Sequence, residues 1–549
     1  MPPGGVARGR SAPVTAGGGP IATRVWIGYA FLLFSVVLII VDYTVVDSVI
    51  PDLVRDLDLT VDDVGTALTS YLATAAAFTI PGGKLADRIG RRLLFLIGLA
   101  LYVAGSTLTG LAWGFWPLVA GRVLQGLSLA IVLPTGLGLL NSLFPQNRPR
   151  RHRALGLWAT AIGVAAGIGP LIGGMMAVTF SWRWAFLAGV PLAAIAAIGI
   201  RLCLPESQKQ AAASFDVGGT TLLVLAAGSL VVVADRWTHL GSGSAALLLT
   251  GTVAAFAGFV WVERARERAG RDVVASLGLF RKRSFAAGTV TAALMSCGDV
   301  GFQLVLPLFT GVVLDYDPLA VGFVLAAYGV GIGLGGGLAE QVCKFFDERT
   351  VALTAVGVLP LTLLALIPMF KSSGSGPLMA AVLAVYGVAW GVAYATLVNM
   401  IFRDVPQSAS AMAGGMQSSM RLLAGALGAA MLTAVFAGVS TTSVESSATA
   451  QQREHLKTHL GASPKVLYSH RRIGRLQHEQ RGTPPFNEAN VAVVNEAYSA
   501  GARATIAVAA GLTLLALGAG LALPRGSPRF PGGGLFTRVR QAAGGAQHR

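Results

Sequence analysis

The sequence predicts an all-α polytopic membrane protein. Of its 549 residues, 54% are hydrophobic and 12% are charged, and the mean hydropathy is +0.65. Apolar runs of about 20 residues, long enough to cross a bilayer as helices, recur from residue 25 to residue 524. This composition excludes a soluble globular protein.

Fourteen apolar runs predict fourteen transmembrane helices. The first run is too long for the core of a signal peptide and lacks a cleavage site, so we expect an uncleaved helix. The runs lie at 25–47, 66–83, 93–113, 116–140, 154–178, 184–204, 216–236, 244–263, 285–313, 319–340, 350–370, 377–401, 413–438 and 501–523.

The basic residues indicate topology rather than nucleic-acid binding, although the formal charge is +16. Most Lys and Arg lie in alternate short loops, including the cluster 148–153 and the run 264–283, which predicts that these loops are cytoplasmic. Both termini are then inside. The segment 440–499 breaks the rule because it is external yet basic, but charge controls topology poorly in a loop of this length.

A short basic turn separates the second and third predicted helices. It runs from Gly82 to Arg92, and four of its eleven residues are Lys or Arg. Gly83 and Gly90 permit a tight turn, and Asp87 is placed to interact with the N-terminus of a helix. The stretch 336–340 weakly repeats this pattern and indicates that a six-helix unit is duplicated.

These observations divide the chain into five regions. They are a disordered cytoplasmic tail (1–24), a first six-helix bundle (25–204), two inserted helices with an amphipathic cytoplasmic segment (205–284), a second six-helix bundle with the external loop 440–499 (285–524), and a basic cytoplasmic tail (525–549).

Charged residues inside predicted membrane helices mark candidate functional positions, because a charge in a bilayer is costly. At about 1.5 Å per residue, Asp42 in the first helix and Arg122 in the fourth lie at roughly 24 Å and 21 Å from the cytoplasmic side. They could form a structural ion pair or a protonatable switch. Gln125 shares the helix face of Arg122.

Glycine and proline cluster in the fifth predicted helix, at Gly163, Gly167, Gly169, Pro170, Gly173 and Gly174. Glycines allow close helix packing and Pro170 bends the helix. The glycine-rich stretch 329–337 superficially matches a dinucleotide fingerprint, but no strand–turn–helix unit surrounds it, so helix packing is favoured.

Two of these motifs resemble those of a known family. The Gly82 to Arg92 turn is similar to the signature loop of the major facilitator superfamily, and the glycines of helix five with Trp182 to Phe186 resemble the antiporter motif of its exporters. With fourteen helices, the chain looks like the 14-helix drug:proton antiporter (multidrug exporter) family. Arg421 with Gly425 and Gly428 fits the family's thirteenth helix, but the family usually has Asn at the position of Asp47.

The resemblance implies a major facilitator fold, with two six-helix bundles around a central cavity that works by alternating access. It also implies that Asp42 and Arg122 take part in proton coupling. Conformational gating is assigned to the short turn and to helix five, at Gly83, Asp87, Arg88, Gly90, Arg91, Gly163, Gly167, Gly169, Pro170, Gly173 and Gly174.

We expect the substrate cavity to be lined by polar and aromatic residues of several helices, namely Asp47, Gln125, Asp299, Gln303, Tyr328, Trp390 and Tyr394. Asp47 is five residues from Asp42, about 140° around a helix, so the two cannot both face one cavity squarely. Asp299 could face a cationic substrate or form a structural pair.

The sequence therefore predicts a proton-driven exporter of amphipathic compounds, with cationic compounds as a candidate class, in a bacterial plasma membrane. A lipid or metabolite exporter is the alternative, and a membrane-embedded enzyme is disfavoured because no nucleophile–base pair is evident. We expect a monomer whose partners are a small amphipathic substrate, protons and membrane lipids. We expect no nucleic acid and no cofactor. His455 and His459 could bind a metal, but no third ligand is evident, and the three cysteines form no motif.

Overall fold

The computed structural model describes residues 20–59, 61–143, 148–206, 216–236, 242–271, 273–406, 409–447 and 488–525. The predictions for most of both tails, for most of the loop 440–499 and for His455 and His459 lie outside the described residues.

All fourteen predicted runs lie in helices. These are α1 (Pro20–Leu57), α2 (Val61–Ile89), α3 (Arg91–Gly110), α4 (Phe115–Leu143), α5 (Arg148–Thr179), α6 (Trp184–Leu187), α7 (Gly189–Cys203), α8 (Val217–Arg236), α9 (Ser242–Arg268), α10 (Arg283–Val312), α11 (Pro318–Val342), α12 (Glu348–Leu366), α13 (Gly376–Phe402), α14 (Ser410–Ser447) and α17 (Glu488–Gly520), with short 3-10 helices η1 (Leu277–Arg281) and η2 (Ile367–Met369).

Twelve stretches of the described helices are long and apolar enough to cross a membrane. The helices α2 and α8 account for the two remaining runs, so the count of fourteen spans stays a prediction. One run, 184–204, is divided at Ala188 into α6 and α7, but Ala188 keeps helical backbone angles, and Trp184–Cys203 is one apolar stretch. Pro191 has no N–H to donate to the carbonyl of Leu187, so one hydrogen bond of the ladder is missing there.

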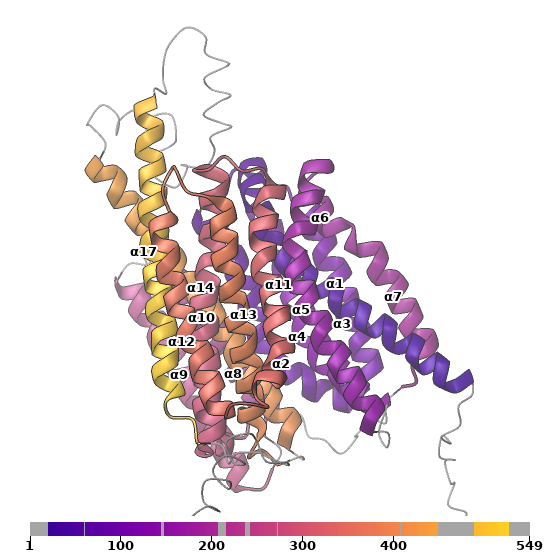
Figure 1. Cartoon of the computed structure of the whole chain (residues 1–549). Helices are drawn as coiled ribbons and strands as arrows, with labels where there is room; N and C mark the ends of the chain where they lie inside the picture. The colour runs from indigo at the N-terminus through magenta and orange to yellow at the C-terminus, as the bar shows by residue number, and fades with distance from the viewer. Residues whose placement is uncertain are drawn as a thin grey trace, which may run out of the picture.

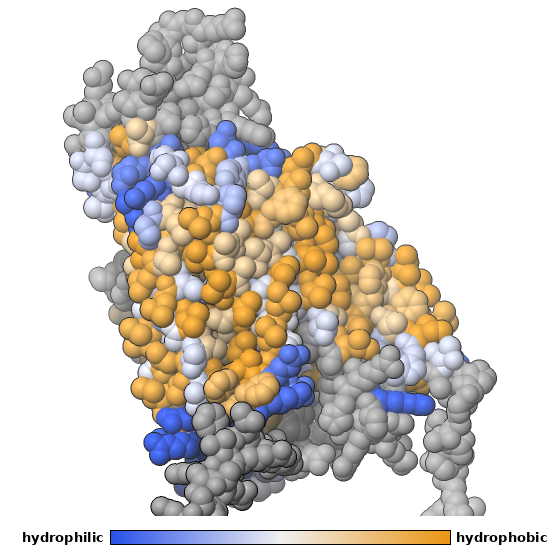
Figure 2. Space-filling model, in the orientation of Figure 1, coloured by the Kyte–Doolittle hydropathy of each residue, from blue (hydrophilic) through white to orange (hydrophobic). Residues whose placement is uncertain are grey.

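The helices pack roughly along one axis, and the described chain begins and ends toward the same end of the bundle (Figure 1). We call this the Gly90 end, after the residue between α2 and α3, and the opposite end the Asp56 end. Apolar residues cover most of the visible face between the two ends, and hydrophilic residues gather toward each (Figure 2). This pattern fits a protein that spans a bilayer.

The two six-helix units, α1–α7 and α10–α17, meet along two antiparallel contacts, which we call the α5–α11 seam and the α2–α14 seam. In the first, Gly167 lies against Gly329 and Gly174 against Pro318. In the second, Ser419 donates a hydrogen bond to the carbonyl of Ala76. Thus, the site between the units is built from both halves of the chain.

The glycine-rich stretch of α11 is a packing surface, as predicted. Gly329 lies against α5, while Gly331 and Gly335 approach the backbone of α13. The inserted helices α8 and α9 pack on each other, and α8 also contacts α2 and α14. The inserted pair therefore touches both halves of the chain.

The first helices of the two halves, α1 and α10, end alike. Both α1 and α10 contain an internal proline, Pro51 and Pro307. Each is followed by an aspartate with positive φ, 52° at Asp58 and 54° at Asp315, a conformation that aspartate adopts more readily than most residues. The halves also contact each other near the Asp56 end, where Pro51 lies beside Gly311.

Candidate functional site

A buried polar cluster surrounds Asp42 of α1. Its carboxylate accepts hydrogen bonds from Ser106 Oγ of α3 at 3.1 Å and from Gln125 Nε2 of α4 at 2.9 Å. Gln125 Nε2 also lies 3.0 Å from Ser106 Oγ. All three side chains are at most 2% exposed. The only ionisable member of this triad is therefore an acid held by neutral donors.

Arg122 lies beside this cluster but contacts Asp42 indirectly. Its Nη1 donates to Gln125 Oε1 at 3.0 Å, and among the described residues it forms no ion pair with Asp42. Its guanidinium lies 4.4 Å from the ring centre of Tyr71. Gly126 lets α4 approach α2 closely, since a Cβ there would lie 2.3 Å from the carbonyl oxygen of Tyr71. Asp42 and Arg122 are thus brought together, with Gln125 as the bridge.

A second polar cluster lies in the C-terminal half, around Asp299 of α10. Tyr328 Oη of α11 donates to the carboxylate at 2.8 Å, and Gln303 Nε2 donates to it at 2.8 Å. Tyr328 and Tyr386 both pack edge-on against Phe302, with ring centres 4.9 and 5.1 Å away. Asp299 therefore has structural partners, while its part in substrate choice stays a prediction.

The two clusters face one region between the halves. A Cβ on Gly425 of α14 would lie 3.6 Å from Val300, the residue after Asp299, and 3.7 Å from Leu72, the residue after Tyr71. Asp47, about one turn after Tyr43 on α1, is 7% exposed. The turn of α14 that follows Arg421 thus packs beside both clusters.

The remaining predicted cavity residues, Trp390 and Tyr394, lie on α13. Their rings are stacked, with centres 5.0 Å apart. Arg421 of α14 lies 5.4 Å from the ring centre of Tyr394. The aromatic pair therefore joins the same site through Arg421, which the sequence analysis did not place there.

Most of the predicted gating turn, Gly82 to Arg92, is helical in the structure. Only Gly90 lies between the end of α2 and the start of α3. Gly90 has φ +113°, which favours glycine, and a Cβ there would lie 2.7 Å from Glu206 Oε1. Arg91 Nη1 donates to the carbonyl of Gly138 in α4 at 2.8 Å. Arg92 Nη1 donates to the carbonyl of Leu204 after α7. These contacts join the turn to α4 and α7 of its own half. Of the other predicted gating residues here, Gly83 packs on α4 and Arg88 is exposed. The Asp87 side chain is outside the described residues.

The glycines of α5 divide between two neighbours. Gly163, Gly167 and Gly174 face α11 of the other half. In contrast, Gly169 and Gly173 face α1, where added Cβ atoms would lie 1.9 Å from Thr44 and 2.4 Å from Ser48 side-chain oxygens. The carbonyl of Pro170 lies next to Gly322 of α11. The motif thus holds α5 against α1 and α11 at once.

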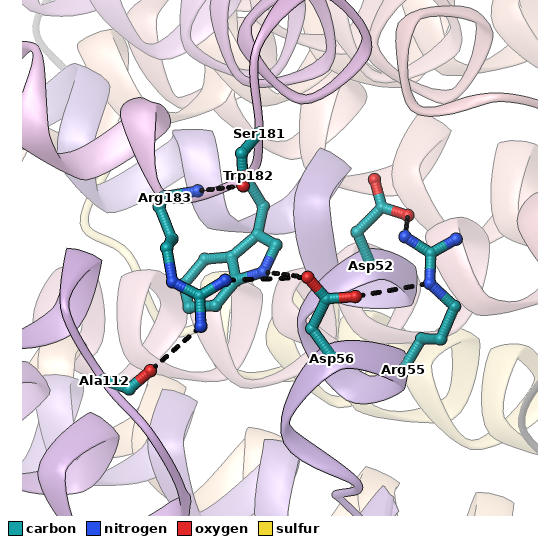
Figure 3. A network of polar contacts seen from close by, with 7 residues as sticks. All are labelled: Asp52, Arg55, Asp56, Ala112, Ser181, Trp182 and Arg183. Carbon is teal, nitrogen blue, oxygen red and sulfur yellow. Dashed lines mark hydrogen bonds and ion pairs between the residues drawn. The ribbon is translucent and has the colours of Figure 1, made fainter.

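A polar network at the Asp56 end was not predicted (Figure 3). Asp56 accepts a hydrogen bond from Trp182 Nε1 at 3.0 Å and pairs with Arg183 at 3.6 Å. Arg183 also donates to the carbonyl of Ala112 at 3.2 Å, and Arg55 pairs with Asp52 at 2.8 Å. The network fastens the end of α1 to the turns after α3 and α5.

Ser106, Tyr71 and Arg421 were not assigned to the site by the sequence analysis, and only one of them carries a signal in the sequence. Ser106 and Tyr71 carry no signal, because serine and tyrosine are common in apolar helices. Arg421 carries the same signal as Arg122, a charge within an apolar run. It could therefore have been assigned to the site from the sequence.

Comparisons with known proteins place the chain in a family. The model of the Major Facilitator Superfamily matches residues 32–429. The multidrug resistance protein Stp of Mycobacterium tuberculosis is 28% identical over 411 residues, which cover 74% of this chain and 75% of that protein. A probable actinorhodin transporter of Streptomyces coelicolor is 28% identical over 453 residues, or 80% of this chain and 78% of that protein.

A solved structure shares the fold. A bacterial homologue of the human lysosomal transporter Spinster, in an inward-facing and occupied conformation, superposes with a TM-score of 0.65 at 16% identity, over 93% of this chain and 100% of that chain. The family match covers more than half of the chain, and the helices form a multi-pass membrane bundle. The chain therefore belongs to the Major Facilitator Superfamily of membrane transporters.

Proposed function

We propose that this transporter is a proton-coupled exporter of amphipathic compounds, working by alternating access in a bacterial plasma membrane. The relatives named for multidrug resistance and actinorhodin transport support export of small molecules. The proposal includes protons and membrane lipids as partners, and a monomeric state. A lipid or metabolite exporter is the alternative. The length of the loop 440–499 favours it, and that loop lies largely outside the described residues.

The buried Asp42 carries the proposal. It is a carboxylate inside a membrane helix, and Ser106 and Gln125 hold it without neutralising it. Protonation would remove its charge and the attraction that acts on Arg122 through Gln125. A site whose charge changes in this way can shift the balance between two conformations, because each conformation binds the proton with different affinity.

Asp42→Asn tests the coupling. Asparagine is nearly isosteric and still accepts the hydrogen bonds of Ser106 and Gln125, so the protein should fold and insert. Because asparagine does not titrate, transport driven by a proton gradient in everted vesicles should fall to the level of vesicles without the protein. Normal transport by this variant at every pH would refute the role of Asp42.

Asp317→Asn is the matched control. Asp317 Oδ1 accepts from the Ala320 amide at 2.7 Å and caps the N-terminus of α11. Asparagine caps helices about as well as aspartate. This variant also loses one carboxylate, yet it should transport at the wild-type rate.

A further inference from the structure

Two similar stacks of a cation and two rings flank the boundary between the halves. In the N-terminal half, Arg122 lies over Tyr71, which stacks on Tyr43 with ring centres 5.3 Å apart and an interplanar angle of 24°. In the C-terminal half, Arg421 lies over Tyr394, which stacks on Trp390 with centres 5.0 Å apart and an angle of 23°. Each guanidinium is thus held over a ring by a cation–π contact.

Both arginines keep N–H groups that have no acceptor among the described residues. These are Nε and Nη2 of Arg122, a residue that is 1% exposed, and Nε of Arg421. Trp390 Nε1 and Gln417 Nε2, one turn before Arg421, are also buried donors without an acceptor. A buried donor without a partner is costly.

The carboxylates of the site do not satisfy these donors. Asp42 accepts from Ser106 and Gln125, and Asp299 accepts from Tyr328 and Gln303. A ligand that complements the site must therefore supply acceptor oxygens to the arginines and a flat face to the rings.

We propose that Arg122 and Arg421 together bind an anionic oxygen, a phenolate or carboxylate, on a flat aromatic substrate whose ring lies against Tyr43 and Trp390. Ser419 donates to the carbonyl of Ala76 and Gly425 lies against Leu72, so the turn of α14 that carries Arg421 packs beside the turn of α2 that carries Tyr71. The proposal rests on the proposed export function, because it assigns the substrate class of the same central site. Guanidinium groups suit this role, since they donate several hydrogen bonds and are always charged.

Two dyes with the same ring system but opposite charge test the proposal. Fluorescein is an anionic xanthene at neutral pH, and rhodamine 6G is a cationic one. Binding to the full chain in lipid nanodiscs would be measured by fluorescence anisotropy without a proton gradient. We expect fluorescein to bind more tightly than rhodamine 6G.

Arg421→Gln should weaken fluorescein binding about tenfold or more, because a charged hydrogen bond is lost, and should change rhodamine 6G binding little. Arg421→Lys, which keeps the charge, should recover part of the affinity. Arg403→Gln is the control, because Arg403 pairs with Glu348 away from the stacks, and its affinities should match the wild type.

Three results would overturn the proposal: tighter binding of rhodamine 6G, no binding of fluorescein by the wild type, or equal loss of fluorescein binding in the Arg421 and Arg403 variants. The first two need no variant, so a misfolded Arg421→Gln protein leaves the test intact. Fluorescein binding without gradient-driven transport would count against proton coupling alone. Gradient-driven transport of rhodamine 6G without fluorescein binding would count against the anionic site alone.

Discussion

The two seams between the halves differ in how closely their backbones approach. In the α5–α11 seam, a Cβ on Gly329 would lie 2.0 Å from the Cα of Gly167. In the α2–α14 seam, a Cβ on Gly415 would lie 3.7 Å from the nearest atom of Ile80, which is ordinary van der Waals distance. The first seam joins backbone to backbone, whereas the closest contacts of the second involve the side chains of Ile80, Ser419 and Thr433.

This difference bears on how the halves move. Side chains can change rotamer when two helices slide, but a backbone contact has no such freedom. Transporters of this kind work largely by rocking one repeat against the other. The comparison therefore predicts that substitutions in the α5–α11 seam cost far more than substitutions in the α2–α14 seam.

Gly329→Ala should have the largest effect. The added methyl group would meet the backbone of Gly167, so the helices must separate, and overpacking of this kind destabilises proteins by about 3 kcal/mol in severe cases. We expect a lower thermal-unfolding midpoint in detergent and at least a tenfold loss of transport in proteoliposomes.

Gly333→Ala is the matched control on the same helix, four residues away. A Cβ there would lie 4.0 Å from Gly163, the nearest atom of a neighbouring helix. Its unfolding midpoint should stay near that of the wild type. Equal midpoints for the two alanine variants would show that α5 and α11 can separate freely.

Ser419→Ala should have an intermediate effect. It removes the hydrogen bond from Ser419 Oγ to the carbonyl of Ala76 across the α2–α14 seam. A buried hydrogen bond contributes about 1 kcal/mol net, so a small drop in the unfolding midpoint is expected, with transport retained. A loss as large as that of Gly329→Ala would mean that the two seams are equally rigid.

Gly415→Ala should have the smallest effect, and of opposite sign. The Cβ has room, and replacing glycine by alanine inside a helix stabilises it by roughly 0.5–1 kcal/mol. The unfolding midpoint should stay level or rise slightly. A clear drop would show that the α2–α14 seam is tighter than its distances indicate.

The helices were predictable from the sequence, but several of their ends were not. An apolar run reports only the part of a helix that lies in the apolar layer. Hence α1 continues to Leu57 beyond the predicted 47, and α17 begins at Glu488 before the predicted 501. The added parts mix polar residues with buried apolar ones, such as Val49 and Leu53 in α1 and Tyr498 in α17, so no unbroken apolar run marks them.

The acids and Arg122 of the site were identifiable because charges are rare inside apolar runs. The contacts of the acids were not, because Ser106 and Tyr328 lie on other helices and nothing in the pattern encodes which helix faces meet; Tyr328 was named as a cavity residue, but not as a partner of Asp299. Depth matching indicated that Asp42 and Arg122 could meet, but it could not show that Gln125 would stand between them.

The closeness of the α5–α11 seam also bears on biogenesis. Synthesis completes α5 at Thr179, makes α11 from Pro318, and reaches α14 only at Ser410. The glycines of α5 that face α11 are therefore synthesised before α11, and the helices between them in the chain enter the membrane first. The first of the two seams for which both helices have been synthesised is therefore the α5–α11 seam, in which backbone meets backbone.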